Sequence, residues 1–275
     1  MSLKRKSSNK VYIGTSGFSY SHWEKGIFYP KDLPKEKQLE YYARHFNTVE
    51  MNYPFYRLPS SKSFSGWKDS VPKGFVFSVK VSRYLTHIKH LHRVKTAWEK
   101  FLKRAQHLEE KLGPFLFQLP PNWKKNMDRL DEFMEMARET DGKHRFVLEF
   151  RNPDWFSGEV YRKLKTRKNI ALCLTNSPDW PFKEIVTGDF VYVRMHGGKT
   201  LYSSNYSKKE LKKWAEKIKK WQAKGLDIYI YFNNDALGYA VKNARTLKLM
   251  LSLIHISEPT RPLSISYAVF CLKKK

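Results

Sequence analysis

The chain has 275 residues, which suits one large domain, and about 250 residues are typical of a (β/α)8 barrel. Hydrophobic residues make up 41% and aromatic residues 15% of it, which is enough for a sizeable core. No apolar run reaches the roughly 18 residues that a membrane-spanning helix needs, so we expect no membrane association. The formal net charge of +26 favours anionic partners but does not indicate a fold.

The two ends of the chain differ from the rest. Residues 1–10 form a basic tail without the apolar stretch of a secretory signal. Residues 251–275 translate back into a sequencing-adapter sequence with an A-tract, so we interpret them as an artefact rather than native chain. The alternative is a genuine strand over Ser264–Leu272. On the artefact interpretation, Cys271 and His255 carry no functional weight and the native domain covers residues 11–250.

Cysteine usage indicates the compartment. The chain contains only Cys173 and Cys271, and Cys173 lies inside an apolar run. A disulfide framework is therefore not expected, and we expect a cytoplasmic protein.

Short apolar runs alternate with helical patterns along the whole chain. The runs, which we expect to be strands, are Val11–Gly14, Thr48–Met51, Phe75–Val79, Phe115–Phe117, Phe146–Leu148, Ile170–Leu174, Phe190–Val193 and Ile228–Phe232. The expected helices are Pro34–Phe46, Arg93–Leu112, Asn126–Glu139, Gly158–Thr166, Ser207–Lys224 and a last one through Ala240, Ala244 and Leu247. Continuous apolar strands joined by helices are typical of parallel sheets buried on both faces. We therefore predict an α/β fold, a single TIM-type (β/α)8 barrel.

Several helix boundaries have their own signals. Gly113 and Pro114 predict the end of the helix over Arg93–Leu112. Ser207 and Glu210 have the spacing of a capping box. The lysines that follow in Ser207–Lys224 are interpreted as a solvated helix face, with a nucleic-acid groove as the alternative.

Two long aromatic-rich connections follow the first two predicted strands, over Phe18–Asp32 and Tyr53–Trp67. Aromatic side chains in such loops can stack on a flat ligand, or they can form a satellite cluster that holds the loops together. We favour the cluster for Trp23, Phe28 and Trp67. We expect Tyr29 and Tyr56 to keep a free hydroxyl for ligand contact.

Polar residues follow nearly every predicted strand. If all eight strands run the same way, these side chains meet at the C-terminal mouth of the barrel, where TIM-type barrels carry their chemistry. The candidates are Glu50, Asn52, Lys80, His87, Gln118, Glu149, Arg151, Arg194, His196, Asn233 and Asp235. An uncompensated charge facing the helix layer would cost several kcal/mol, which favours the mouth.

These residue types suggest roles. Glu50 and Glu149 are candidate general bases, and His196 is a candidate proton carrier near neutral pH. The cations Lys80, Arg151 and Arg194 are expected to stabilise anionic oxygens. The alternative is that Glu149 and the arginines form an ion-pair layer that closes the barrel. Asn233 and Asp235 fit a turn and helix cap as well as a ligand site.

Strong cofactor signals are missing. The sequence has no HExxH, no paired CxxC and no glycine-rich dinucleotide fingerprint, so it indicates neither a metal nor a cofactor. The turn Gly14–Gly17 is a weak candidate for backbone N–H groups that bind an anion. Oligomeric state is likewise not indicated.

At these motifs the chain resembles the YecE-like family, also called domain of unknown function 72. The matching residues are Gly14–Tyr20, Trp23, Phe28–Pro30, Thr48–Asn52, Phe55–Pro59, Lys80, Thr86, His87, Gln118–Pro120, Glu149–Arg151, Trp155, Tyr192–Gly197 and Tyr231–Asp235. The resemblance spans about residues 11–249 and implies a TIM-type barrel. It implies no reaction, because the family has none assigned.

The leading functional hypothesis is an enzyme that binds a small anionic or polar ligand at the barrel mouth and performs acid–base chemistry. One alternative, motivated by the charge and the loop aromatics, is a barrel that binds or processes nucleic acid. Another is a ligand sensor without catalytic activity.

Overall fold

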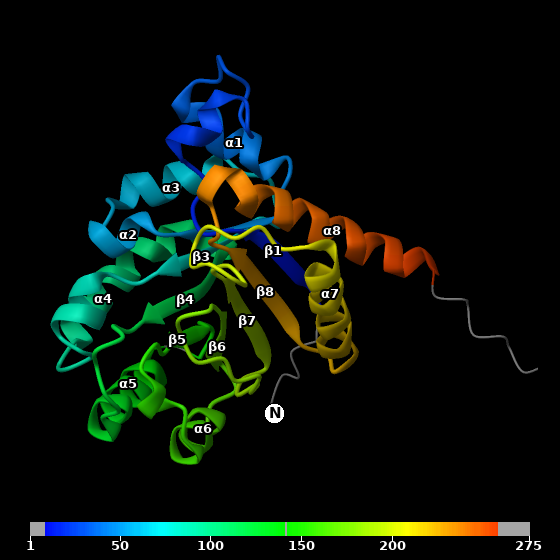
Figure 1. Ribbon diagram of the computed structural model, residues 1–275. Coiled ribbons are helices and arrows are strands. Elements are labelled where there is room, and N and C mark those ends of the chain that lie inside the picture. The colour runs from blue at the N-terminus through cyan, green and yellow to red at the C-terminus, as the bar shows by residue number, and fades with distance from the viewer. Residues whose placement is uncertain (1–8, 141, 258–275) are drawn as a thin grey trace, which may run out of the picture.

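The structure, a computed structural model, describes residues 9–140 and 142–257. Eight strands form one parallel sheet in the order β1-β8-β7-β6-β5-β4-β3-β2 (Figure 1). The strands are β1 (Val11–Thr15), β2 (Thr48–Met51), β3 (Val76–Lys80), β4 (Leu112–Gln118), β5 (Phe146–Glu149), β6 (Ile170–Asn176), β7 (Phe190–Met195) and β8 (Asp227–Phe232). The predicted TIM-type barrel is confirmed, with each predicted strand in place.

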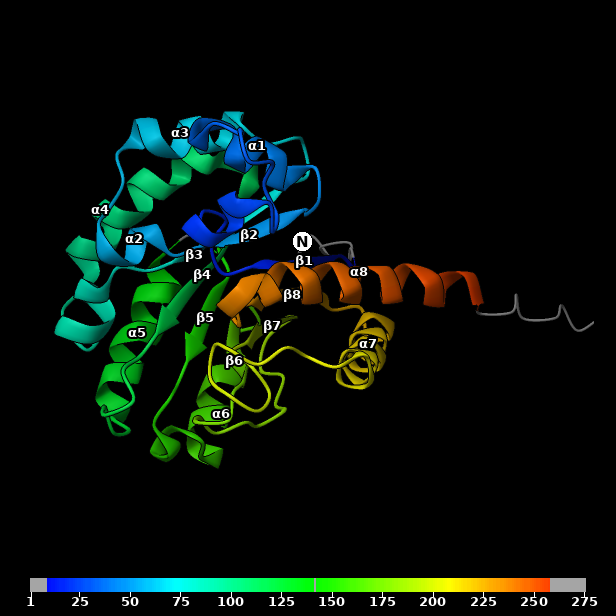
Figure 2. The same ribbon diagram turned by 45° about the horizontal axis from the view of Figure 1, so that its top comes forward.

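Helices surround the sheet (Figure 2). They are α1 (Gln38–Ala43), α2 (Tyr53–Tyr56), α3 (Ser61–Asp69), α4 (Lys95–Ala105), α5 (Met127–Glu139), α6 (Gly158–Lys165), α7 (Lys208–Ala223) and α8 (Tyr239–Ser257). The connection between β6 and β7, residues 177–189, contains no helix. It packs Phe182, Ile185 and Val186 against the core, and the Thr187 hydroxyl accepts a hydrogen bond from the Leu172 amide at 2.8 Å.

Two apolar clusters sandwich the strands. The inner one fills the barrel with Tyr12, Leu116, Val147, Ala171, Cys173, Phe190, Tyr192, Tyr229 and Tyr231. The outer one lies between the strands and the helices. Side chains alternate between the two faces of a strand, so burial on both faces explains why the strands read as continuous apolar runs.

The barrel closes at β1 and β2 through side chains as well as backbone. Only an isolated bridge, Ser16 to Glu50, joins these strands in the regular pattern. Below it, Asn47 accepts from the Ile13 amide at 3.4 Å and donates to the Val11 carbonyl at 3.1 Å. The Tyr42 hydroxyl accepts from the Thr15 amide at 2.9 Å and donates to the Thr48 carbonyl at 3.1 Å. These side chains take the place of missing ladder bonds.

Glycine is required at this seam. A Cβ on Gly14 would lie 2.2 Å from the Thr48 carbonyl oxygen, a distance that real Cβ atoms essentially never show. The close approach of β1 and β2 therefore excludes every larger residue at this position.

The predicted helix end at Gly113 and Pro114 is wrong. Helix α4 ends at Ala105, a 3-10 segment follows, and both residues lie in β4. Pro114 is tolerated because the register between β3 and β4 shifts here, at an irregularity where a missing N–H costs little. A Cβ on Gly113 would meet Val76 Cγ1 at 2.5 Å, so this glycine serves strand packing.

The second aromatic connection contains two helices that the sequence analysis read as a loop. The Ser60 hydroxyl caps α3 by accepting from the Ser63 amide at 3.1 Å, and Phe64 is the buried residue on its inner face. In α7 the predicted capping box of Ser207 and Glu210 is confirmed. Its apolar face is buried as predicted, while its lysines lie on the outer side.

Candidate functional site

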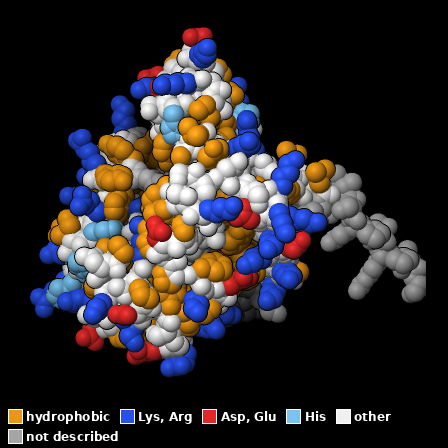
Figure 3. Space-filling model, viewed as in Figure 1, with side chains coloured by type: hydrophobic (Ala, Val, Ile, Leu, Met, Phe, Trp, Pro, Cys, Tyr) orange, Lys and Arg blue, Asp and Glu red, His pale blue; other side chains and the backbone are white. Residues whose placement is uncertain are grey.

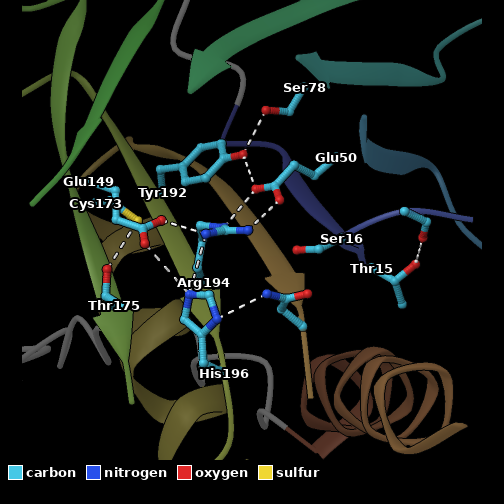
Figure 4. Close-up of polar contacts among 12 residues, drawn as sticks. Thr15, Ser16, Glu50, Ser78, Glu149, Cys173, Thr175, Tyr192, Arg194 and His196 are labelled. Carbon is cyan, nitrogen blue, oxygen red and sulfur yellow. Dashed lines mark hydrogen bonds and ion pairs between the residues drawn. The ribbon is translucent and has the colours of Figure 1, made fainter. Parts of the chain in front are cut away.

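Predicted polar residues converge at the C-terminal ends of the strands, and Figure 4 shows Glu50, Glu149, Arg194 and His196 among them. Glu50, Lys80, Gln118 and Glu149 lie at or next to the ends of β2, β3, β4 and β5, and Arg194 lies near the end of β7. All five side chains are buried. The shared direction of the parallel strands brings these distant residues together.

Arg194 is the centre of a buried ion-pair network. Its Nη2 and Nε donate to the two carboxylate oxygens of Glu50 at 2.8 and 3.0 Å, and its Nη1 donates to Glu149 Oε2 at 2.6 Å. The Tyr192 hydroxyl adds a third donor to Glu50, at 2.7 Å. Arg194 is 1% exposed and both glutamates are 0% exposed. At this depth an unpaired charge would be costly, so the residues stabilise one another as a unit.

Glu149 also holds a second arginine. Arg151 Nε donates to Glu149 Oε1 at 2.9 Å, and the Arg151 guanidinium lies 3.7 Å from the centroid of the Trp180 ring. Burial alone would raise the pKa of Glu149, but Arg194 and Arg151 outweigh it and hold that pKa well below its usual range. Glu149 is therefore a carboxylate at every physiological pH.

A cavity of about 930 Å³ opens above this network. Its lining residues come from the strand ends and from the loops that follow β1, β2, β3 and β7. They are Gly17, Phe18, Ser19, Tyr20, Met51, Asn52, Tyr53, Phe55, Tyr56, Trp67, Lys80, Arg83, His87, Gln118, Pro121, Arg151, Arg194, Tyr202 and Asn233. A volume of this size accommodates a small-molecule ligand.

The charges on the cavity wall all have one sign. Lys80, Arg83, Arg151 and Arg194 line it, whereas no Asp or Glu is among the described lining residues. Glu50 and Glu149 lie behind Arg194 and Arg151 and are fully buried. A wall of aromatic rings with inward cations fits an anion that carries a flat or apolar part.

Lys80 differs from the arginines in its surroundings. It is 8% exposed, and its Nζ lies 4.0 Å from the centroid of the Phe55 ring. Within residues 9–140 and 142–257 its ammonium has no hydrogen-bond or ion-pair partner. Burial, followed by the nearby Arg194, lowers the pKa of Lys80 to about 7.

His87 lies beside Lys80 on a π-helical turn, Tyr84–Ile88. Its Nδ1 is 2.9 Å from the Thr86 hydroxyl, and its Nε2 is 3.4 Å from the Gln118 side-chain nitrogen. Burial and the charge of Lys80 lower the pKa of His87 to about 4. His87 is therefore a neutral imidazole at pH 7. Single π-helical turns often occur at functional sites.

His196 is near the network but does not line the cavity. It is 0% exposed, with its Nδ1 at 3.0 Å from the Asn233 side-chain nitrogen and its Nε2 at 3.8 Å from Glu149 Oε1. Burial and Arg194 lower its pKa well below the usual range. This imidazole is neutral near pH 7.

Three sequence-based expectations need correction. Tyr29 is 1% exposed and lies outside the cavity lining, and its hydroxyl is not free, because it donates to the Phe18 carbonyl. Asp235 lies in a neighbouring depression, where its carboxylate is 2.9 Å from His22 Nε2. The Gly14–Gly17 turn offers no free amides, because the Ser16 and Gly17 N–H groups donate to other strands at 2.9 and 2.8 Å.

The remaining candidates lie where the sequence placed them. Asn52, Tyr56 and Gln118 line the cavity, and the Asn52 side-chain oxygen is buried without a hydrogen-bond partner in the part of the chain that the structure describes. Trp23 and Phe28 are buried in the predicted aromatic cluster, whereas Trp67 also reaches the cavity.

Several site residues escaped the sequence analysis. Trp180 stands in an irregular loop without periodicity, and Arg83 and Tyr202 lie beyond the strand ends. Tyr192 resembles an ordinary strand residue in the sequence. Because side chains alternate along a strand, its spacing of two from Arg194 could have predicted that both lie on the same face.

Neither a metal site nor a membrane-spanning helix is present among the described residues. No three His, Cys, Asp or Glu side chains within residues 9–140 and 142–257 form a group that could hold a metal ion. No helix in these ranges is both long and apolar enough to cross a membrane.

The fold and site define a TIM-type barrel with a cation-lined cavity at its C-terminal mouth. The chain belongs to the family described as "Protein of unknown function DUF72", whose model matches residues 12–263. This confirms the resemblance seen in the motifs.

Relatives support this membership. The chain is 25% identical to UPF0759 protein YunF of Bacillus subtilis, over 90% of this chain and 95% of that protein. It is 28% identical to UPF0759 protein YecE of Escherichia coli, over 54% of this chain and 50% of that protein. A crystal structure of a DUF72 family protein from Thermotoga maritima superposes with a TM-score of 0.78 at 31% identity, covering 88% of this chain and 99% of that one.

Proposed function

We propose that the protein is an enzyme that binds a small anion with a flat or apolar part in the barrel mouth and performs acid–base chemistry on it. The observation that carries this proposal is the cavity wall, with four basic side chains, several aromatic side chains and no described carboxylate. Such a wall attracts an anion and stacks against its uncharged part. Cys173, a buried free thiol, supports a cytoplasmic location.

Lys80 is the best candidate proton carrier. It lines the cavity, and a pKa of about 7 lets it give or take a proton near neutral pH. A general acid or base works best when its pKa lies near the working pH.

The network beneath has a supporting role in this proposal. Glu50 and Glu149 were predicted as proton carriers, but their oxygens are taken up by Arg194, Arg151 and Tyr192. Held in this way, the carboxylates keep Arg194 and Arg151 oriented toward the ligand. His196, buried next to Arg194, is likewise assigned to support.

The test identifies the ligand by mass spectrometry of small molecules that co-purify with the protein. We expect an anion that is retained by the wild type and lost from Arg151→Gln, because that variant removes one cavity cation without removing Arg194. Arg57→Gln, an exposed arginine outside the cavity lining, serves as the matched control. Equal retention by the two variants would exclude an anion site at Arg151. Binding without conversion of the ligand would identify a sensor instead.

A second candidate function is the binding or processing of nucleic acid. Tyr53, Tyr56 and Tyr202 line the cavity and are 52%, 72% and 39% exposed, so bases could stack on them. Lys and Arg side chains also outnumber acidic ones over the face shown in Figure 3. The test is the salt dependence of affinity for an oligonucleotide, because contacts with phosphates give a steep slope of log affinity against log salt. A flat slope would reject this function.

A further inference from the structure

Lys80 has the surroundings of a reactive amine rather than of an ion-pair partner. It ends β3 and lines the cavity, and the face of the Phe55 ring lies next to its Nζ. The carboxylates of Glu50 and Glu149, which could have paired with it, are bonded to arginines instead. Burial and the nearby Arg194 disfavour the charged form of this amine, whereas the face of the Phe55 ring favours it.

The charged groups that face Lys80 act on its pKa in opposite directions, and the net effect with burial is to lower it. Burial is the largest influence on its pKa, and Arg194 on β7 lowers it further, as does Arg151 after β5. Glu149 and Glu50 raise the pKa but do not compensate. With a pKa of about 7, a large fraction of Lys80 is a neutral amine at physiological pH, and the neutral amine is the nucleophilic form.

We propose that Lys80 forms a covalent imine with a small anionic aldehyde or ketone, such as an oxo acid. This inference rests on the proposed anion-binding function. The Lys80 nitrogen lone pair forms a bond to the carbonyl carbon while the C=O π bond breaks. The C–O bond then breaks and the carbonyl oxygen leaves as water. Of the two amine protons and one solvent proton, two end on that water and one stays on the imine nitrogen. The product is a protonated imine and one water, so no oxidant, reductant or further reactant is needed.

The cavity supplies what this step requires. Arg83 and Arg151 line the same cavity as Lys80 and offer charge-assisted hydrogen bonds to the substrate anion. The bound anion offsets the positive charge of the imine among these cations. Lys80 is 8% exposed and the Phe55 ring covers its Nζ, which limits access of the water that would hydrolyse the imine.

The experiment traps the imine chemically. The full chain is incubated with glyoxylate and sodium cyanoborohydride, which reduces an imine to a stable amine, and peptides are mapped by mass spectrometry. We expect the peptide with Lys80 to be labelled about tenfold or more faster than the one with exposed Lys89, because its amine is neutral and the substrate is bound beside it. Acetaldehyde, a carbonyl without the anion, should label Lys80 more slowly.

Variants separate this inference from the proposed function. Lys80→Met and Lys80→Arg should both lose the fast labelling, whereas Lys89→Met should keep it. Two Lys80 variants are used in case one fails to fold, and thermal melting shows whether each is folded. Glyoxylate binding is measured in parallel by calorimetry on the wild type and Arg151→Gln. Binding that depends on Arg151 without an adduct on Lys80 overturns the imine but leaves the anion site standing. Fast labelling of Lys80 that is the same with acetaldehyde and in Arg151→Gln overturns the anion site instead.

Discussion

Arg194 joins two carboxylates that come from strands far apart in the chain, Glu50 on β2 and Glu149 on β5. Its guanidinium lies 2.8 Å from one Glu50 oxygen and 2.6 Å from one Glu149 oxygen. One cation therefore contacts two buried anions across the interior of the barrel. Glu149 also forms an ion pair with Arg151, which lines the cavity.

The first prediction concerns this network. Glu50→Gln removes one anion and leaves Arg194 with a single carboxylate in a fully buried place. We expect the free energy of unfolding to fall by about 3–5 kcal/mol, because breaking a buried ion pair strands its partner. Urea unfolding followed by circular dichroism measures the change. Glu40→Gln, in an exposed ion pair on α1, is the control and should unfold like the wild type. If both variants unfold alike, the network does not stabilise the barrel.

The second prediction concerns the pH dependence that Lys80 confers. Its pKa is lowered from 10.5 to about 7 in the folded protein, so between these values the unfolded state binds more protons. Stability attributable to Lys80 therefore rises with pH across this window, by at most about 1.4 kcal/mol per pH unit, and the penalty is largest below pH 7.

Lys80→Met tests this dependence. The variant should be more stable than the wild type at pH 6 to 7, and the difference should shrink as the pH approaches the ordinary lysine value of 10.5. Urea unfolding of both proteins at several pH values gives the difference curve. A difference that is constant with pH would show that Lys80 keeps an ordinary pKa.

The third prediction concerns Trp180. Its ring covers the Arg151 guanidinium at 3.7 Å, and such a contact contributes about 0.5–2 kcal/mol. Trp180→Ala should therefore weaken binding of an anion in the cavity by about 2- to 30-fold, because Arg151 is then held by Glu149 alone. Calorimetric titration of the co-purified anion measures this. Trp180→Tyr keeps a ring over Arg151 and should restore most of the affinity; if Tyr and Ala behave alike, stacking is not what positions Arg151.

The fourth prediction concerns the seam between β1 and β2. Gly14→Ala places a methyl group against the Thr48 carbonyl and should prevent closure, seen as loss of soluble protein or a strongly lowered melting temperature. Gly66→Ala in α3 meets no atom within 4 Å and should stabilise the protein by about 0.5–1 kcal/mol, because alanine favours helix. A tolerated Gly14→Ala would mean that the seam is wider than described.

The strands were predictable because their signal is local. Ile170–Leu174 is apolar at every position since both faces of the strand are buried, and most of the other runs are apolar for the same reason. The misread helix end at Gly113 and Pro114 shows where local signals fail. There the strand pairing itself tolerates a residue without N–H, and the sequence does not reveal an irregular register.

The site was predictable only in outline. Placing Glu50, Glu149 and Arg194 at the mouth required only that parallel strands share a direction. Their separation into a buried network below and a cavity wall above could not be read from spacing, because it depends on strand tilt and stagger. Trp180 had no detectable signal, since an irregular loop carries it to Arg151.

By itself, the sequence determined the alternation of strands and helices and the polarity of the strand ends, because hydrophobic burial and chain direction act through near neighbours. Only the tertiary structure decided that Arg194 takes both glutamates as partners and that Lys80 pairs with no carboxylate among the residues that the structure describes. Ion pairing falls off within a few ångströms, so which charges compensate one another is fixed by the closed barrel, not by their order along the chain.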